Sequence, residues 1–242
     1  GSVAYSVSVS SGGKLILPTE WTGTIRNIVL SGSEPGLDMK SGTVNNLVLG
    51  TDGSNGTILI SGGTFKQISN RCNEEISVKG FLKEYYAFKQ GMGMLTYDTE
   101  IPYNRDLTNI TVVLCEEHRD KDGNNLCDFC NQGFTACVQT TDKDGNTANY
   151  SGLQGAFNEA QDDATVKLLA DIPARTENTA YIVDKKQLTL DLDNRTISGN
   201  GISATNGANL IITGNGIVAG TVAFDSTSQG TLENGRFGSV IS

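Results

Sequence analysis

The chain has 242 residues, a net charge of −9, 29 glycines and only 4 prolines. This length allows one elongated domain or two compact ones. The composition argues against a helical bundle, because Gly, Asn and Asp supply turn corners and Thr, Val and Ile suit strands. An acidic surface repels phosphate backbones, so nucleic acid is not an expected partner. No apolar run approaches the roughly 20 residues of a membrane span.

Both ends of the sequence suggest a fragment of a longer polypeptide. Gly1 and Ser2 resemble a cloning remnant, and the final stretch GRFGSVIS stops within a patterned segment. We therefore give the missing signal peptide little weight.

Residues 1–75 contain an internal repeat of about twenty residues. The stretches GTIRNIVL, GTVNNLVL and GTFKQI begin at Gly23, Gly42 and Gly63. A short strand with one apolar face is not stable alone, but stacked coils bury that face continuously. We predict a first β-helix segment here. An antiparallel β-sandwich also has many short strands, but it does not explain the near-constant spacing.

Residues 76–138 break the repeat and begin with an aromatic-rich stretch. Aromatic clusters can stack on sugars or anchor protein contacts. Four tyrosines form a candidate binding patch: Tyr85, Tyr86, Tyr97 and Tyr103. We favour a structural alternative, a small β-rich flap whose rings pack on the solenoid end, because a chain with few aromatic residues needs large side chains to close its core.

The same region contains LCEEHRDKDGNNLCDFC, with three of the five cysteines and the only histidine. Its spacing, C-x2-H-x8-C-x2-C, joins two chelating pairs by a short loop. Zinc prefers a tetrahedral shell of thiolate and imidazole, and four protein ligands leave no position for water. The loop is too polar to fold by burying a core, and a metal could supply that stability. The pattern favours a structural zinc site with four ligands: Cys115, His118, Cys127 and Cys130.

Disulfides are one alternative, because cysteines of secreted proteins usually pair. Cys115 would bond Cys127 or Cys130, and Cys72 would bond Cys137. This scheme leaves one thiol over and gives the histidine no role.

Calcium could bind the same loop alongside either arrangement. Oxygen-bearing side chains occupy positions 1, 3, 5 and 9 of an EF-hand-like pattern: Asp120, Asp122, Asn124 and Asp128. The match is partial, because Asn125 replaces the usual glycine and Asn131 the bidentate glutamate. The string DKDGN recurs at Asp142 without cysteines, which indicates a favourable turn.

Residues 139–242 predict a helix followed by a second β-helix segment. Ser151 is the expected N-cap of a helix with four apolar residues on one face: Leu153, Ala156, Phe157 and Ala160. We expect this helix to cap the open end of the solenoid and protect its edge. Similar stretches then begin at Leu188 and Leu210, and Gly-Thr starts recur at Gly220 and Gly230.

Most of residues 10–70 and 165–242 resemble right-handed parallel β-helices of the pectin-lyase-like class, particularly those in large surface proteins of Gram-positive bacteria. The pattern CxxHxDxDGxxxCDxC resembles a short module of the same proteins, which implies a structural joint. The expected fold is mainly β, with two solenoid segments, an inserted Cys/His knuckle and one capping helix. The fold alone does not specify a function, because it carries lyases, hydrolases, adhesins and inert stalks.

The favoured interpretation is a non-catalytic fragment of a secreted or cell-wall-attached protein. It would act as an adhesin or stalk, with a host surface protein, an immunoglobulin or a glycan as its partner. The alternative is a carbohydrate-active enzyme, a polysaccharide lyase or glycoside hydrolase. Its candidates are Asp191 and Asp193, placed by alternation on one strand face, with Arg195 nearby. The acids of one strand make a weak catalytic constellation.

Overall fold

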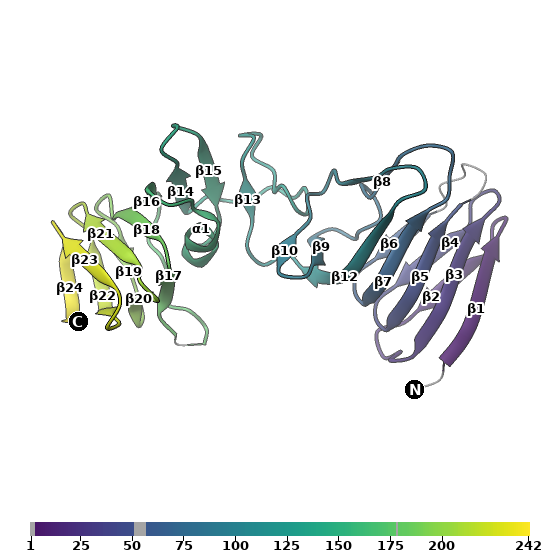
Figure 1. Cartoon of the computed structure of the whole chain (residues 1–242), viewed down its shortest axis with the longest axis horizontal. Coiled ribbons are helices and arrows are strands. Elements are labelled where there is room, and N and C mark those ends of the chain that lie inside the picture. The colour runs from purple at the N-terminus through teal and green to yellow at the C-terminus, as the bar shows by residue number, and fades with distance from the viewer. Residues whose placement is uncertain (1–2, 51–56, 178) are drawn as a thin grey trace. The chain divides into compact units, whose positions relative to one another are not determined.

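The structure is a computed structural model that describes residues 3–50, 57–177 and 179–242. The cloning remnant expected at Gly1 and Ser2 lies outside these ranges. The protein is mainly β, with 51% strand and 3% helix (Figure 1). No helix in the described ranges is long and apolar enough to cross a membrane. The chain forms two compact units: Gly1–Glu116 with Asp128–Gln132, and Glu117–Cys127 with Gly133–Ser242.

The first unit is a β-solenoid built from two stacks of parallel strands. The longer stack contains β1 (Val3–Ser10), β3 (Thr24–Ser31), β5 (Thr43–Leu49) and β7 (Thr64–Asn70). The shorter stack contains β2 (Lys14–Leu17), β4 (Gly36–Met39) and β6 (Ile58–Ile60). These stacks confirm the predicted solenoid.

The sequence repeat sets the register of the longer stack. Thr24, Thr43 and Thr64 follow the repeat glycines and pair across β3, β5 and β7. Gly42 has a φ of 90°, and a Cβ there would overlap the Trp21 ring, so this corner requires glycine. Inside the stack, Ile28, Leu47 and Ile68 pair with one another, and each is 0% exposed.

The flap of the first unit ends the parallel stacking. Its strands are β8 (Ile76–Ser77), β9 (Tyr86–Gln90), β10 (Gly93–Met94), β11 (Glu100–Ile101) and β12 (Asp106–Leu114). β12 lies antiparallel between β7 and β9 (Figure 1). Phe81 and Phe88 are buried in the same core as the solenoid strands. The prediction that flap rings pack on this core is therefore confirmed for these two residues.

The second unit contains another β-solenoid with two strand stacks. One sheet follows the order β13 (Arg119–Asp120), β15 (Thr147–Tyr150), β14 (Val138–Thr141), β16 (Ala164–Leu168), β18 (Gln187–Asp191), β21 (Asn209–Thr213) and β23 (Gln229–Leu232). The other contains β17 (Tyr181–Asp184), β20 (Gly201–Thr205), β22 (Ile217–Phe224), β19 (Thr196–Ile197) and β24 (Arg236–Ile241).

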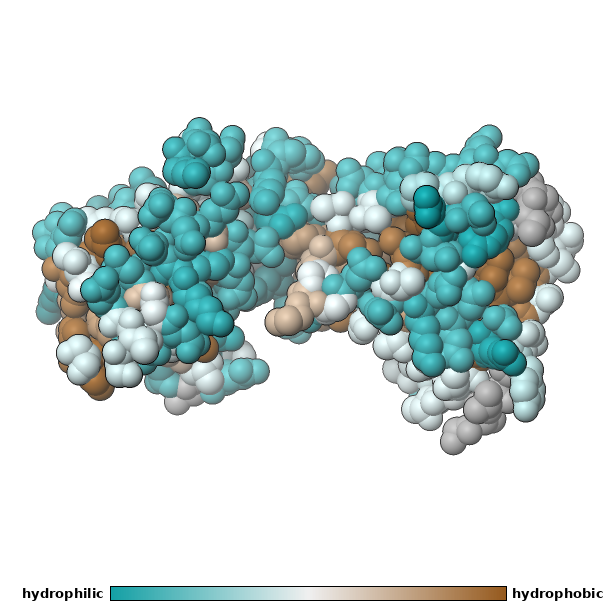
Figure 2. Space-filling model, in the orientation of Figure 1, coloured by the Kyte–Doolittle hydropathy of each residue, from teal (hydrophilic) through white to brown (hydrophobic). Residues whose placement is uncertain are grey.

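Part of the repeat in this unit was predicted and part was not. Leu188 pairs with Leu210, as their spacing indicates. Gly220 and Gly230 lie in β22 and β23, which belong to different sheets, so their Gly-Thr starts do not stack on one another. Apolar side chains gather at the surface of the last strands, including Val240 of β24 (Figure 2).

The predicted helix is α1 (Leu153–Glu159), and its apolar face packs into the core of the second unit. The N-cap prediction is wrong. Gly152 occupies that position without a side-chain cap. The Ser151 hydroxyl instead accepts a hydrogen bond from the backbone N–H of His118 at 2.8 Å. This tertiary contact uses the oxygen that a local cap would need.

Candidate metal centre

The Cys/His segment brings the four predicted ligands together. Cys115, His118, Cys127 and Cys130 each offer one ligand atom, and these atoms all lie within 4.8 Å of one another. The three cysteines are 2–4% exposed, and the histidine is half-buried. The structure joins none of these three cysteines in a disulfide, so each sulfur can serve a metal as a thiolate. The four side chains could therefore hold a metal ion.

Backbone hydrogen bonds position the first chelating pair. The N–H of Cys115, just after β12, donates to the carbonyl of Tyr85 at 2.7 Å. The Ser151 N–H donates to the His118 carbonyl at 3.0 Å, which complements the bond to the Ser151 hydroxyl. The His118 ring stacks on Phe134, with 5.4 Å between ring centroids. The hydrogen bonds fix the backbone of His118, and the stacking on Phe134 orients its ring.

A buried aspartate folds the loop that leads to the second chelating pair. Asp120 is 2% exposed, and its two oxygens accept from the N–H groups of Gly123 at 2.7 Å and Asn125 at 3.0 Å. The Asn124 side-chain oxygen accepts from the Leu126 N–H at 2.7 Å. Gly123 and Asn125 have φ values of 76° and 64°, which a tight turn requires. The loop thus returns the chain to Cys127 without an apolar core.

Several of the candidate calcium ligands already accept hydrogen bonds within this turn. Asp120, Asp122 and Asp128 have carboxylate oxygens within 4.8 Å of one another. Both oxygens of Asp120 already accept backbone N–H groups, and Asn124 bonds Leu126 and Asp122. Exposed acidic groups commonly gather without an ion. Calcium binding therefore stays a prediction.

The second DKDGN string forms the turn between β14 and β15. One Asp142 oxygen accepts from the N–H groups of Asp144 and Asn146, both at 2.9 Å. The side-chain amide of Asn146 also donates to Asp142, and this bond is the main reason that the pKa of Asp142 lies below its usual value. The expectation that the string is a favourable turn is confirmed here.

The four tyrosines of the candidate patch have different surroundings. Tyr85 and Tyr103 are 50% and 58% exposed. Tyr86 is partly buried against the core of the first unit, and Lys79 Nζ lies 5.9 Å from the centre of the Tyr97 ring. Ligand binding by this set stays a prediction.

Of the two acidic residues named for the enzyme alternative, Asp191 ends a strand and Asp193 lies in the turn that follows. β18 ends at Asp191, and Asp193 follows with a φ of 39°, so the expected common strand face is wrong. Asp191 Oδ1 accepts from the Asp193 N–H at 3.0 Å, and Asp193 Oδ2 lies 3.3 Å from Lys167 Nζ. Arg195 is exposed, and its N–H donates to the Leu192 carbonyl. These contacts account for the residues as parts of a turn.

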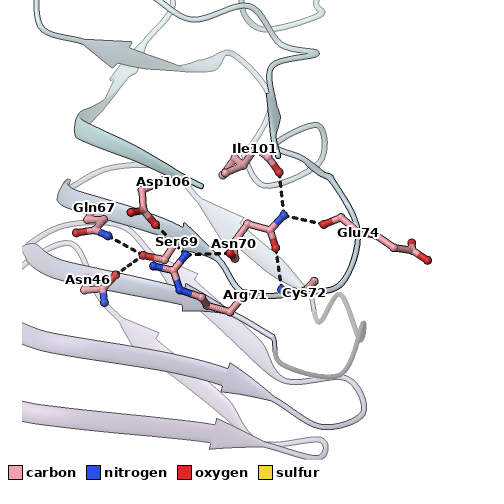
Figure 3. Close-up of polar contacts among 9 residues, drawn as sticks. All are labelled: Asn46, Gln67, Ser69, Asn70, Arg71, Cys72, Glu74, Ile101 and Asp106. Carbon is pink, nitrogen blue, oxygen red and sulfur yellow. Dashed lines mark hydrogen bonds and ion pairs between the residues drawn. The ribbon is translucent and has the colours of Figure 1, made fainter. Parts of the chain in front are cut away.

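Sequence reasoning missed a polar network at the end of β7 (Figure 3). Asn70 is 0% exposed, and both polar atoms of its side chain have hydrogen-bond partners. Its Nδ2 donates to the carbonyls of Glu74 at 2.7 Å and Ile101 at 2.8 Å, and its Oδ1 accepts from the Cys72 N–H at 2.8 Å. The amide therefore fastens the flap to the last solenoid coil. The only sequence signal is a polar residue ending an alternating strand.

A charged pair extends this network to β12. Arg71 Nη1 lies 3.0 Å from Asp106 Oδ1 and donates to the Asn70 carbonyl at 3.0 Å (Figure 3). Burial raises the pKa of Asp106, but hydrogen bonds from Ser69, Gln67 and Arg71, together with the Arg71 charge, hold it below its usual value. The ionised carboxylate thus helps to hold β12 in place.

Comparison of the chain with models of protein families, with curated proteins and with solved structures finds no match.

Proposed function

We propose that this chain is a non-catalytic segment of a secreted or cell-wall-attached bacterial surface protein, in which a structural zinc ion folds the Cys/His segment. The convergence of three buried thiols and one imidazole within 4.8 Å carries the metal part of this proposal. The segment would serve an adhesin or stalk of the kind found on Gram-positive bacteria.

The donor set favours zinc over harder cations. Thiolate ligands select soft or borderline metals, whereas calcium and magnesium take oxygen ligands. Cys3His is a common shell for structural zinc, and it fills all four tetrahedral positions. The ion would be bound by Cys115, His118, Cys127 and Cys130, and no coordination position would remain for a reacting water.

The composition of the loop gives the metal a structural task. Between Cys115 and Cys127, the only apolar residue is Leu126, and it is 37% exposed. Such a loop cannot gain stability from apolar burial. Zinc binding contributes about 10–16 kcal/mol in small zinc modules, which offsets a large part of the conformational entropy lost when such a loop is ordered.

The solenoids support the surface role. Each unit buries most of its apolar residues inside stacked coils, and the outer faces carry many polar side chains. This architecture presents repeated side chains on regular surfaces, which suits a scaffold for contacts with a host protein, an immunoglobulin or a glycan. The exposed rings of Tyr85 and Tyr103 are one candidate contact.

Metal and thiol analysis of protein purified without chelator tests this proposal. We expect about one zinc ion per chain and loss of that zinc in Cys127→Ser and His118→Ala. Cys137→Ser is the matched control, because Cys137 lies outside the ligand cluster and should keep full zinc. Protein that contains no metal and has disulfides among Cys115, Cys127 and Cys130 would refute the zinc centre.

A further inference from the structure

A hollow of about 360 Å³ opens in the second unit, beside the C-terminal end of α1. It lies over the face of the β14–β15 hairpin that carries Thr140 and Ala148, which pair with one another. The helix covers the same face nearer Val138 and Tyr150, but it ends at Glu159. The volume falls at the lower end of the roughly 300–1,000 Å³ typical of small-molecule pockets.

The floor of the hollow combines methyl groups with the hydroxyl of Thr140. Ala148, Ala160 and Ala164 line it and are 1–6% exposed. Thr140 also lines it and is 7% exposed, and the structure gives its hydroxyl no hydrogen bond among the described residues. The Thr140 hydroxyl faces the hollow, where a ligand could donate a hydrogen bond to it or accept one from it.

The rim carries both donors and acceptors. Asp142 and Glu159 supply carboxylates, and Glu159 is held by Arg119 at 3.0 Å. Gln161 supplies an amide and Lys121 an ammonium group, while the Asn146 amide is engaged by Asp142. Two acids and one base give the lining side chains a net negative charge, which disfavours ligands with phosphate, sulfate or carboxylate groups.

We propose that this hollow binds the terminal ring of a neutral carbohydrate. A sugar ring presents C–H groups to a methyl floor and hydroxyl groups to the rim. Each hydroxyl both donates and accepts, which matches the mixture of carboxylates and amides in the lining. The inference names a ligand class for the adhesin role proposed above, and rests on that role.

Saturation-transfer NMR on the full chain tests this inference. The probes are glucose, galactose, mannose and N-acetylglucosamine, with N-acetylneuraminic acid as the anionic probe and putrescine as the cationic one. We expect at least one neutral sugar to bind with a dissociation constant of about 1 mM, from the binding energy per atom of ordinary small ligands. Binding of no neutral sugar, or of the charged probes alone, would overturn the inference.

Two variants place the binding in the hollow. Thr140→Val keeps the side-chain shape but removes the hydroxyl, and should weaken binding about tenfold. Thr141→Val is its control, because Thr141 is the next residue of the same strand and does not line the hollow. Gln161→Ala removes an exposed rim amide with little risk to folding, and Gln229→Ala is its control. Unchanged affinity in both hollow variants would exclude this site.

Zinc content measured on the same samples separates this inference from the metal proposal. Folded protein with full zinc and no sugar binding would overturn the carbohydrate site alone. Sugar binding by folded protein without zinc would support the hollow and contradict the zinc centre.

Discussion

Gln154 of α1 pairs with Ile182 of β17 through both ends of its side-chain amide. Nε2 donates to the Ile182 carbonyl at 2.9 Å, and Oε1 accepts from the Ile182 N–H at 2.8 Å. β17 is the outermost strand of its sheet, so the amide occupies hydrogen-bonding positions that a foreign strand could use. The capping helix therefore protects an edge with a side chain in addition to covering the core.

Lys186 anchors the other end of the same helix. Its Nζ donates to the carbonyls of Phe157 at 3.0 Å and of Asn158 and Ala160 at 2.6 Å. These carbonyls have no partner in the next helical turn, and a cation at a helix C-terminus also complements the helix dipole. The turn between β17 and β18, which carries Lys186, thus helps to fix where α1 ends.

Gln154→Ala should destabilise the second unit by about 1–2 kcal/mol, because it leaves both polar groups of the edge backbone without their partner. Urea denaturation with hydrogen exchange at β17 and β20 measures this change. Trp21, the only tryptophan, packs on the core of the first unit, so its fluorescence transition should not move. A variant with unchanged exchange at Ile182 would show that the amide pair is not stabilising.

The solenoid coils could be predicted because the sequence pattern that specifies each coil is short and recurs in the next coil. Thr24, Thr43 and Thr64 hold equivalent places in successive repeats, and equivalence of position fixes the register of parallel strands. The ligand set of the metal centre could be predicted for a similar reason, since paired ligands two residues apart are read from spacing alone.

The features that sequence reasoning missed depend on distant partners. Asn70 bonds the carbonyl of Ile101, thirty-one residues away, and nothing near Asn70 specifies that contact. Ser151 precedes a helix as an N-cap should, but its hydroxyl meets the His118 backbone instead. The hollow exists because α1 ends before the tip of the adjoining hairpin. Relative lengths of this kind emerge only when the elements are assembled.

Asp106→Asn should change how the stability of the first unit depends on pH. The folded pKa of Asp106 lies below the unfolded value of 3.8, so its contribution is present above pH 3.8 and is lost as the pH falls through the folded pKa. The variant lacks this contribution throughout. We expect wild type to be more stable than the variant at pH 6, with the difference shrinking in more acidic solution.

Urea denaturation followed by Trp21 fluorescence measures this difference, because Trp21 reports on the first unit. Asp98→Asn is a suitable control, since Asp98 is an exposed flap residue for which the structure gives no ion pair among the described residues. A wild-type advantage that stays constant down to pH 2 would contradict a role for the ionised carboxylate.

Asp120→Ala should weaken zinc binding by about 10–100-fold, the effect typical of groups that support metal ligands. The carboxylate holds two backbone N–H groups of the loop between the chelating pairs, so its loss leaves Cys127 and Cys130 without a fixed approach. Competition with a chromogenic chelator measures the affinity. Asp142→Ala is the matched control, because Asp142 performs the same task in the second DKDGN turn, away from the cysteines. Equal losses in both variants would indicate general destabilisation.

Removal of the metal with a strong chelator should unfold residues 115–130 and leave the solenoid coils folded. The coils bury their own apolar side chains, whereas residues 115–130 bury no apolar side chain except Phe129 and the three cysteines. Hydrogen exchange should therefore accelerate at the amides of Cys115 and His118, which the structure places in hydrogen bonds. The amides of Asn146 and Leu210 should keep their protection, since they lie in a metal-independent turn and in a solenoid strand. Restored protection on addition of zinc, but not of calcium, would assign the site to the thiolate and imidazole donors. Unchanged exchange at Cys115 and His118 after complete zinc removal would show that the loop folds without it.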